Sequence, residues 1–311
     1  MFLFLSIFAG FMVALMIQLN GILQDAAGGL SALLNIHISG LLGILVLTLL
    51  LKILPLKGFR NQIQAGGEIP GKYSPEELKK KAPWYYLTAG MLGSAIVFLA
   101  SVSYLKGGIL VSLSGSLAGQ TLAASITESL YSKERDKSPL LQRLLAPTLL
   151  IPGSLIIGFK EEVALLWILI SWTPGIILMI QQSMNAGNTL RWGTPKTVLF
   201  NYISALTLII PIFLIFGSSA VKEISGLPWY IISGGGLIGV FTTGTIAFLL
   251  LKAPALMVIL GIYTGELSGG IILDLYNGNP IAIEKIMGIL LIAAGLASGK
   301  INLKQKKVKA T

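Results

Sequence analysis

The chain alternates between long apolar runs and short polar breaks along almost all of its 311 residues. A helix needs about 20 apolar residues to cross a hydrocarbon core of about 30 Å. Helices are expected because a lipid-exposed segment must satisfy its own backbone hydrogen bonds, and the short alternating segments of a membrane barrel are not seen. The pattern predicts an all-α membrane protein with ten transmembrane helices, at residues 2–22, 29–52, 84–105, 108–131, 142–159, 164–188, 195–217, 229–251, 253–276 and 281–299.

Composition agrees with this interpretation. Hydrophobic residues make up 54% of the chain, charged residues only 12%, and the mean hydropathy is +0.82, whereas a soluble domain is about 25% charged. The first run has neither a basic start nor a small-residue cleavage site, so we expect it to be a retained span. Cysteine is absent, which excludes disulfides, cysteine metal sites and thiol catalysis.

The basic residues indicate an orientation. With the N-terminus inside, 19 of the 23 lysines and arginines fall in segments expected to be cytoplasmic, and the other four are Lys106, Lys160, Lys222 and Lys285. Basic residues concentrate on the cytoplasmic side of membrane proteins, so we expect a multi-pass protein of the inner (cytoplasmic) membrane with both termini in the cytoplasm. This distribution also explains the net charge of +10, and nucleic-acid binding is not expected.

Internal comparison indicates a duplication. An offset of 165 places Gly10 on Gly175, Asn20 on Asn185 and Ile38-Ser39 on Ile203-Ser204. An offset of 145 places Pro83-Trp84-Tyr85 on Pro228-Trp229-Tyr230 and Gly90 on Gly235, and an offset of 146 places Gly115 on Gly261 and Gly119 on Gly265. Near the end of each unit, an offset of 142 places Gly153 on Gly295. The expected units are residues 1–159 and 160–311, the second with a basic cytoplasmic tail. Because five spans is an odd number, the second unit is expected to be inverted, as in many secondary transporters.

These residues resemble a known family. The first two spans carry Gly, Asn and Ser in that order, Pro-Trp opens the third span, and Gly119-Gln120 lies on the fourth. This order of motifs resembles that of the YdcZ-like inner-membrane exporters of the drug/metabolite transporter (DMT) superfamily. The resemblance implies a bacterial-type secondary transporter of small molecules built from two fused five-span units. The family pattern has a glutamine four residues before the asparagine of the first span. Gln181 fits this pattern in the second half, but Met16 replaces the glutamine in the first half.

Glu266 is the main candidate for a functional side chain. It stands in the apolar stretch VILGIYTGELSGGIILDLY, about 20 Å from the expected cytoplasmic end of its helix, and its counterpart in the first half is Gln120. A charge at mid-membrane costs about 2.5–3.5 kcal/mol on insertion scales and usually marks an ion pathway or a proton relay. The alternative is a protonated acid that only links two helices.

Other polar and aromatic side chains are weaker candidates. Tyr263 stands three residues before Glu266, where its hydroxyl could bond the carboxylate or its ring could face a cation; it could equally be a core aromatic. Trp172 lies about eight residues into its span and is a candidate for lining the solute path.

Two pairs of corresponding residues complete the candidate site. His37, the only histidine, matches Tyr202 and could relay protons or simply bond another helix. Asn20 and Asn185 either line the pathway or cap and turn the ends of their helices.

The sequence thus favours a secondary-active transporter that moves a small metabolite or drug-like solute by alternating access. An acid at mid-membrane favours a cationic or zwitterionic solute and would allow exchange against protons. A passive channel is the alternative. An intramembrane enzyme is not expected, because His37 is the only base available to a serine nucleophile and neither an HExxH motif nor a Walker motif occurs. No cofactor or metal is expected; the partners are a solute and the lipid bilayer, and the oligomeric state stays open.

Overall fold

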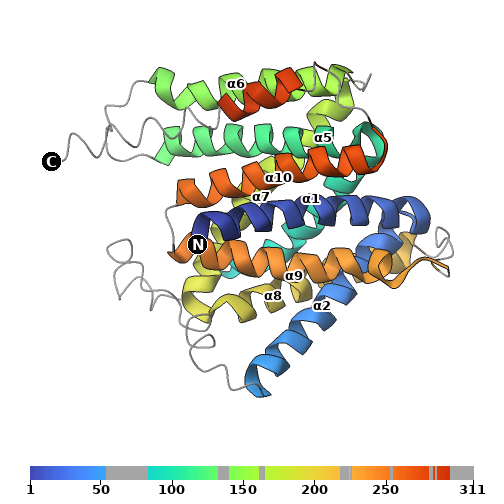
Figure 1. Cartoon of the computed structure of the whole chain (residues 1–311). Helices are drawn as coiled ribbons and strands as arrows, with labels where there is room; N and C mark the ends of the chain where they lie inside the picture. Colours follow the sequence, from blue (N-terminus) through green and yellow to red (C-terminus); the bar gives the residue numbers. More distant parts are fainter. Residues whose placement is uncertain are drawn as a thin grey trace.

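The computed structural model describes residues 1–53, 83–131, 140–160, 165–217, 224, 226–252, 255–279, 283 and 286–294. All regular elements in these residues are helices (Figure 1), which confirms the all-α prediction. The elements are α1 (Phe2–Ala27), α2 (Gly29–Ile53), η1 (Trp84–Thr88), α5 (Ala89–Tyr131), α6 (Leu140–Lys160), α7 (Leu165–Trp192), α8 (Thr194–Phe216), α9 (Trp229–Lys252) and α10 (Ala255–Tyr276). Residues 286–294 are also helical.

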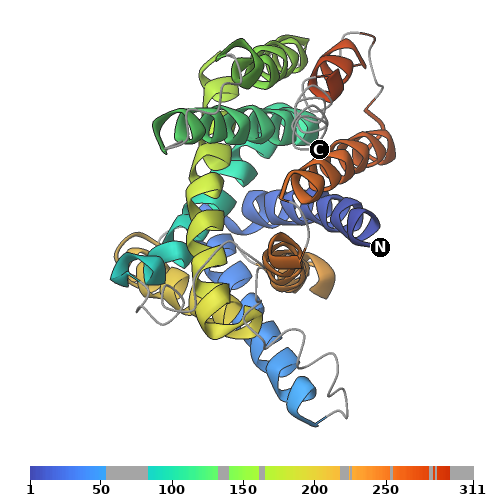
Figure 2. The same ribbon diagram turned by 90° about the vertical axis from the view of Figure 1, so that its left-hand side faces the viewer.

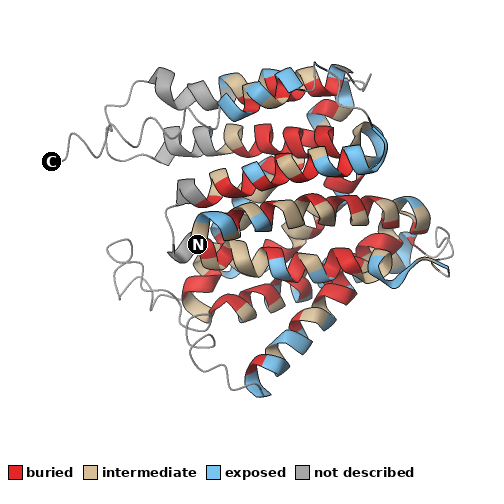
Figure 3. Ribbon diagram, in the orientation of Figure 1, coloured by how far each residue is buried: buried red, intermediate tan, exposed pale blue. Residues whose placement is uncertain are grey.

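Seven helical segments of the described residues are long and apolar enough to cross a membrane. The third of them runs from Trp84 to Ala123, and its 40 residues would measure about 60 Å if straight, twice the thickness of a hydrocarbon core. Figure 3 shows exposed positions along the outside of the bundle, α2 among them. On α2 the exposed residues include the apolar Leu42, Val46 and Leu49. Such a surface suits a lipid environment.

The long helix α5 turns back on itself at Gly108 (Figure 1). This residue has φ 76° and ψ 179°, a conformation that glycine adopts without a Cβ penalty. The Ser112 hydroxyl donates a hydrogen bond of 2.9 Å to the carbonyl of Ala100, twelve residues earlier, whereas a straight helix would separate these residues by about 18 Å. The two parts, residues 89–107 and 109–131, therefore correspond to the predicted third and fourth spans.

Two single glycines make corresponding turns between long helices. Gly28 joins α1 to α2 with φ 82°, and Gly193 joins α7 to α8 with φ 79°. The two positions differ by 165, the offset at which the first two spans match the sixth and seventh. Both helices before these turns are longer than predicted, because α1 ends at Ala27 and α7 at Trp192.

The helices form a single bundle in which sequence-distant elements pack side by side. The two most extensive contacts are α5 with α7 and α1 with α10. Figures 1 and 2 show α10 beside α1, and Figure 2 shows α7 crossing the other helices at a steep angle. The largest apolar core joins side chains of α1, α5, α6, α7, α9 and α10, so it spans both halves of the chain.

Candidate functional site

A cavity of about 170 Å³ lies between α1, α2, α5, α7, α8, α9 and α10. An apolar cavity of about 150 Å³ holds a molecule the size of benzene, so the space is sufficient for a small organic solute. Eight of the nine predicted site residues line it: Asn20, His37, Gln120, Gln181, Asn185, Tyr202, Tyr263 and Glu266. Whether they bind a solute stays a prediction, but the structure brings them together.

One end of the cavity, here called the acid end, is formed by Glu266, Gln120 and Tyr263. The Tyr263 hydroxyl on α10 donates a hydrogen bond of 3.2 Å to Oε1 of Gln120 on α5. The tyrosine thus bonds the counterpart of Glu266 and not Glu266 itself. Glu266 is 3% exposed, faces the cavity and has no hydrogen-bond partner among the described residues.

Glycine contacts hold the backbone of the acid end in place. A methyl group added at Gly10 of α1 would overlap the carbonyl of Ile262 and approach the backbone nitrogen of Glu266; one added at Gly265 would overlap the carbonyl of Ile7. Small residues at such positions let two membrane helices approach closely. The close packing of α1 against α10 therefore fixes the position of Glu266.

The same contact recurs between α7 and the second part of α5. A methyl group at Gly175 would overlap the carbonyl of Ser116 and approach the nitrogen of Gln120, and one at Gly119 would overlap the carbonyl of Trp172. Gly175 follows Gly10 by 165 residues, and Gln120 precedes Glu266 by 146. Corresponding glycines therefore position Gln120 and Glu266.

Contacts also refine the offset between the two halves. Gly90 lies against the carbonyl of Asn201 and the hydroxyl of Ser204, and Gly236 lies against the carbonyl of Ile36 and the hydroxyl of Ser39. These contacts pair Gly90 with Gly236 at an offset of 146, whereas the sequence comparison paired it with Gly235. On α6, Gly153 lies against Gly288; Gly295, its counterpart in the sequence comparison, lies outside the described residues.

Charge in the cavity has one sign. Among the residues that line it, Glu266 is the only acid, and neither lysine nor arginine occurs. Elsewhere in the described part of the chain, no three histidine, aspartate or glutamate side chains gather closely enough to hold a metal ion. The lining can therefore neutralise a cation but has no fixed positive charge for an anion.

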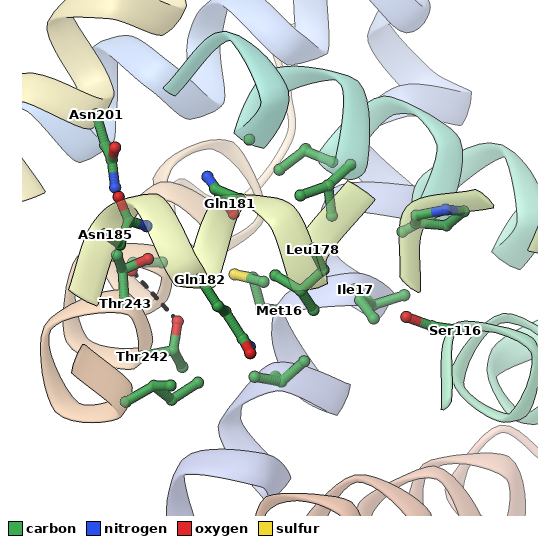
Figure 4. A pocket seen from close by; sticks show the side chains of 18 of the residues that line it. Met16, Ile17, Ser116, Leu178, Gln181, Gln182, Asn185, Asn201, Thr242 and Thr243 are labelled. Carbon is green, nitrogen blue, oxygen red and sulfur yellow. Dashed lines mark hydrogen bonds between the residues drawn. The ribbon is translucent and has the colours of Figure 1, made fainter. Parts of the chain in front are cut away.

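The opposite end, here called the amide end, is formed by Asn20, Asn185 and Asn201. These side chains are 2%, 6% and 8% exposed, and none makes a hydrogen bond with a described residue. Oδ1 of Asn20, Oδ1 of Asn185 and Nδ2 of Asn201 are fully buried without a partner. Figure 4 shows Asn185 and Asn201 pointing toward each other, with Gln181 and Gln182 nearby on α7.

The helix-capping interpretation of Asn20 and Asn185 is wrong. Both lie seven residues before the ends of their helices, Ala27 and Trp192, and the turns are made by Gly28 and Gly193. The helices continue past both asparagines, and both side chains line the cavity.

Gln181 and the pair His37 and Tyr202 also connect helices around this end. Nε2 of Gln181 donates a hydrogen bond of 3.0 Å to the carbonyl of Ala89 on α5. His37 bonds the carbonyl of Leu33 on its own helix through Nδ1 at 2.8 Å, and its ring meets Tyr202 edge-on at 5.9 Å. The Tyr202 hydroxyl donates to the carbonyl of Gly236 at 3.0 Å. The two corresponding residues thus meet where α2 and α8 pack together.

Trp172 does not line this cavity. Its carbonyl lies against Gly119, and its indole Nε1 is buried without a hydrogen-bond partner. It therefore belongs to the contact of α7 with α5.

Several polar lining residues were not predicted: Ser101, Ser116, Gln182, Asn201, Thr242 and Thr243. Asn201 stands next to the predicted Tyr202, and Gln182 next to Gln181. A polar side chain inside an apolar run is the available signal, but the sequence does not show which face of the helix meets a cavity.

Comparisons with known proteins agree with this architecture. The profile of the family described as "Putative inner membrane exporter, YdcZ" matches residues 1–156 and 166–298. The chain belongs to this family. The two matched segments are consistent with two fused YdcZ units. Membership supports a membrane transporter and makes an enzyme unexpected.

Solved structures show the same fold. One crystal structure, identified only as that of a protein, aligns with 98% of this chain and 96% of its own at 15% identity, with a TM-score of 0.58. At this identity the likeness establishes the fold alone. A comparison with curated proteins found no match.

Proposed function

We propose that this YdcZ-family protein is a secondary-active transporter that moves a small cationic or zwitterionic solute by alternating access. The observation that carries the proposal is the acid end: Glu266 is buried, has no hydrogen-bond partner among the described residues and lines a solute-sized cavity without lysine or arginine. An uncompensated acid at this depth is costly unless it meets a cation or a proton.

The proposed architecture is ten transmembrane helices arranged as two inverted five-helix repeats, residues 1–159 and 160–311. It is supported by equivalent backbone contacts in the two halves, made by Gly10 and by Gly175, and by Gly265 and by Gly119. The equivalent turns at Gly28 and Gly193 also support it. Inverted repeats allow one fold to open to either side of the membrane by exchanging the conformations of its halves.

In the proposed cycle, Glu266 exchanges a proton for the solute. A cationic group entering the cavity meets the carboxylate, with the Tyr263 ring beside it as a further cation-binding surface. When the cavity opens to the other side, a proton returns the acid to its neutral form and the cation leaves. Gln120 occupies the corresponding position in the other half but cannot change its charge.

We propose that both termini lie in the cytoplasm. The asymmetry of the lysines and arginines supports this orientation. Tags placed at residue 65 and at the C-terminus should be protected from external labelling in whole cells, and a tag at residue 221 should be labelled. Labelling of the first two from outside would contradict the orientation.

The function is tested by flux into proteoliposomes with an imposed pH gradient, across a panel of organic cations, zwitterions and anions. The proposal predicts saturable uptake of a cation or zwitterion that responds to the gradient. Flux that rises linearly with concentration and ignores the gradient would indicate a passive channel. Selective transport of anions would contradict the assignment of Glu266.

A further inference from the structure

The three unpaired asparagines at the amide end are a feature that the acid end does not explain. A buried amide left without partners costs about 1–3 kcal/mol, and buried polar groups in proteins are nearly always satisfied. One amide atom of each of Asn20, Asn185 and Asn201 breaks this rule, at one end of one cavity. The folded chain therefore leaves one polar atom of each of these amides without a hydrogen-bond partner.

The amide end is distant from Glu266. Gly10 of α1 lies against the backbone of Glu266, and Asn20 follows ten residues later; Gly175 of α7 lies against the backbone of Gln120, and Asn185 follows ten residues later. Ten residues of helix rise by about 15 Å. One small group therefore cannot contact both ends of the cavity.

Apolar side chains make up much of the wall between the two ends, with Gln182 among them. They include Val13 and Ile17 on α1, Val97 on α5, Leu178 on α7 and Ile246 on α9; Figure 4 shows Ile17 and Leu178 between the amide end and Ser116. The cavity thus offers a carboxyl group at one end, a mainly apolar stretch, and carboxamides at the other end.

We propose that the amide end is a second subsite, which binds an uncharged hydrogen-bonding group of the solute, such as a primary carboxamide. Carboxamides both donate and accept hydrogen bonds, so three of them suit a group that does the same. Combined with the acid end, the subsite selects an elongated solute with an amine at one end and an amide at the other. This inference rests on the proposed function, because it takes the cavity as the solute site.

The test uses linear amino amides of increasing chain length, each compared with its N,N-dimethylamide, which keeps the acceptor but has no N–H donors. Binding to the purified full chain is measured by thermal shift and by competition. The primary amide is expected to bind about three- to ten-fold tighter than its dimethyl form, the gain of roughly one buried hydrogen bond. The gain should be largest at the chain length that spans the two ends.

Variants separate this subsite from the acid end. Asn185→Ala and Asn201→Leu should abolish the preference for the primary amide but still bind the simple amine. Asn35→Leu, on α2 and outside the cavity lining, is the matched control and should keep the preference. Glu266→Gln should weaken the amine and its amides alike.

Each outcome bears on one of the two proposals. If the wild-type chain binds the amines through Glu266 but shows no preference for the primary amide at any length, the subsite is overturned and the amide end holds only water. If no amine binds, or Glu266→Gln changes nothing, the proposed function fails and the subsite fails with it.

Discussion

Two helix pairs, α1 with α10 and α7 with the second part of α5, use corresponding glycines but present different side chains to the cavity. Gly10 holds the backbone of Glu266, and Gly175 holds that of Gln120. Gly239 lies near Met16, and its counterpart Gly93 lies near Gln181. The backbone contacts are thus retained in both halves, while the cavity side chains differ, which separates the residues needed for packing from those that give the cavity its chemistry.

The glycines should give the largest effects, and equal ones in both halves. Gly10→Ala and Gly175→Ala each place a methyl group against backbone atoms that cannot rotate away, so each should lower the free energy of unfolding by about 1–3 kcal/mol. The measurement is thermal unfolding of the purified variants. Gly244→Ala is the control, because its methyl group would lie 3.7 Å from the nearest side-chain atom and should be tolerated. A large effect in only one half would break the correspondence.

Gln181→Met gives the second half the residue of the first half. It removes the hydrogen bond to the carbonyl of Ala89 and should cost about 1 kcal/mol in stability. Gln182→Met is the control, since the Gln182 amide has no hydrogen-bond partner among the described residues. Equal unfolding midpoints for the two variants would show that the bond between α7 and α5 contributes nothing.

Tyr263→Phe should have the smallest effect. It removes the hydroxyl that bonds Gln120 but keeps the buried ring, and the freed amide lines the cavity where water can reach it. We expect a loss of about 0.5 kcal/mol, at the low end for a hydrogen bond, and a small rise in KM for solute. A loss of folding would instead identify Tyr263 as an essential core residue.

The sequence predicted the fold class and much of the cavity because membrane burial leaves few reasons for a polar side chain. Glu266, Gln120 and the asparagine pair could be recognised by their depth and by their recurrence. The contacts between helices were less predictable. The partner of Tyr263 comes from α5, 143 residues away, and local spacing pointed to Glu266 instead.

Helix ends and helix rotation account for the other differences. Asn20 and Asn185 were compatible with capping until Gly28 and Gly193 were seen to end the helices. The recurrence of these glycines at the same offset is a signal that the sequence comparison missed. Asn201 and Thr242 face the cavity because of how α8 and α9 pack, and an almost uniformly apolar helix carries no pattern that fixes its rotation.

The central claim is that Glu266, and not its counterpart Gln120, responds to protons during transport. The most direct measurement is the pH dependence of solute flux in proteoliposomes for the wild type and for Glu266→Gln, with Asp274→Asn as a control buried acid outside the cavity lining. The amide keeps the size and hydrogen bonding of the acid but not its charge. We expect Glu266→Gln to fold, reach the membrane and lose the pH response, while Asp274→Asn retains it. A wild-type rate and pH profile in Glu266→Gln would contradict the account and leave Glu266 as a packing residue.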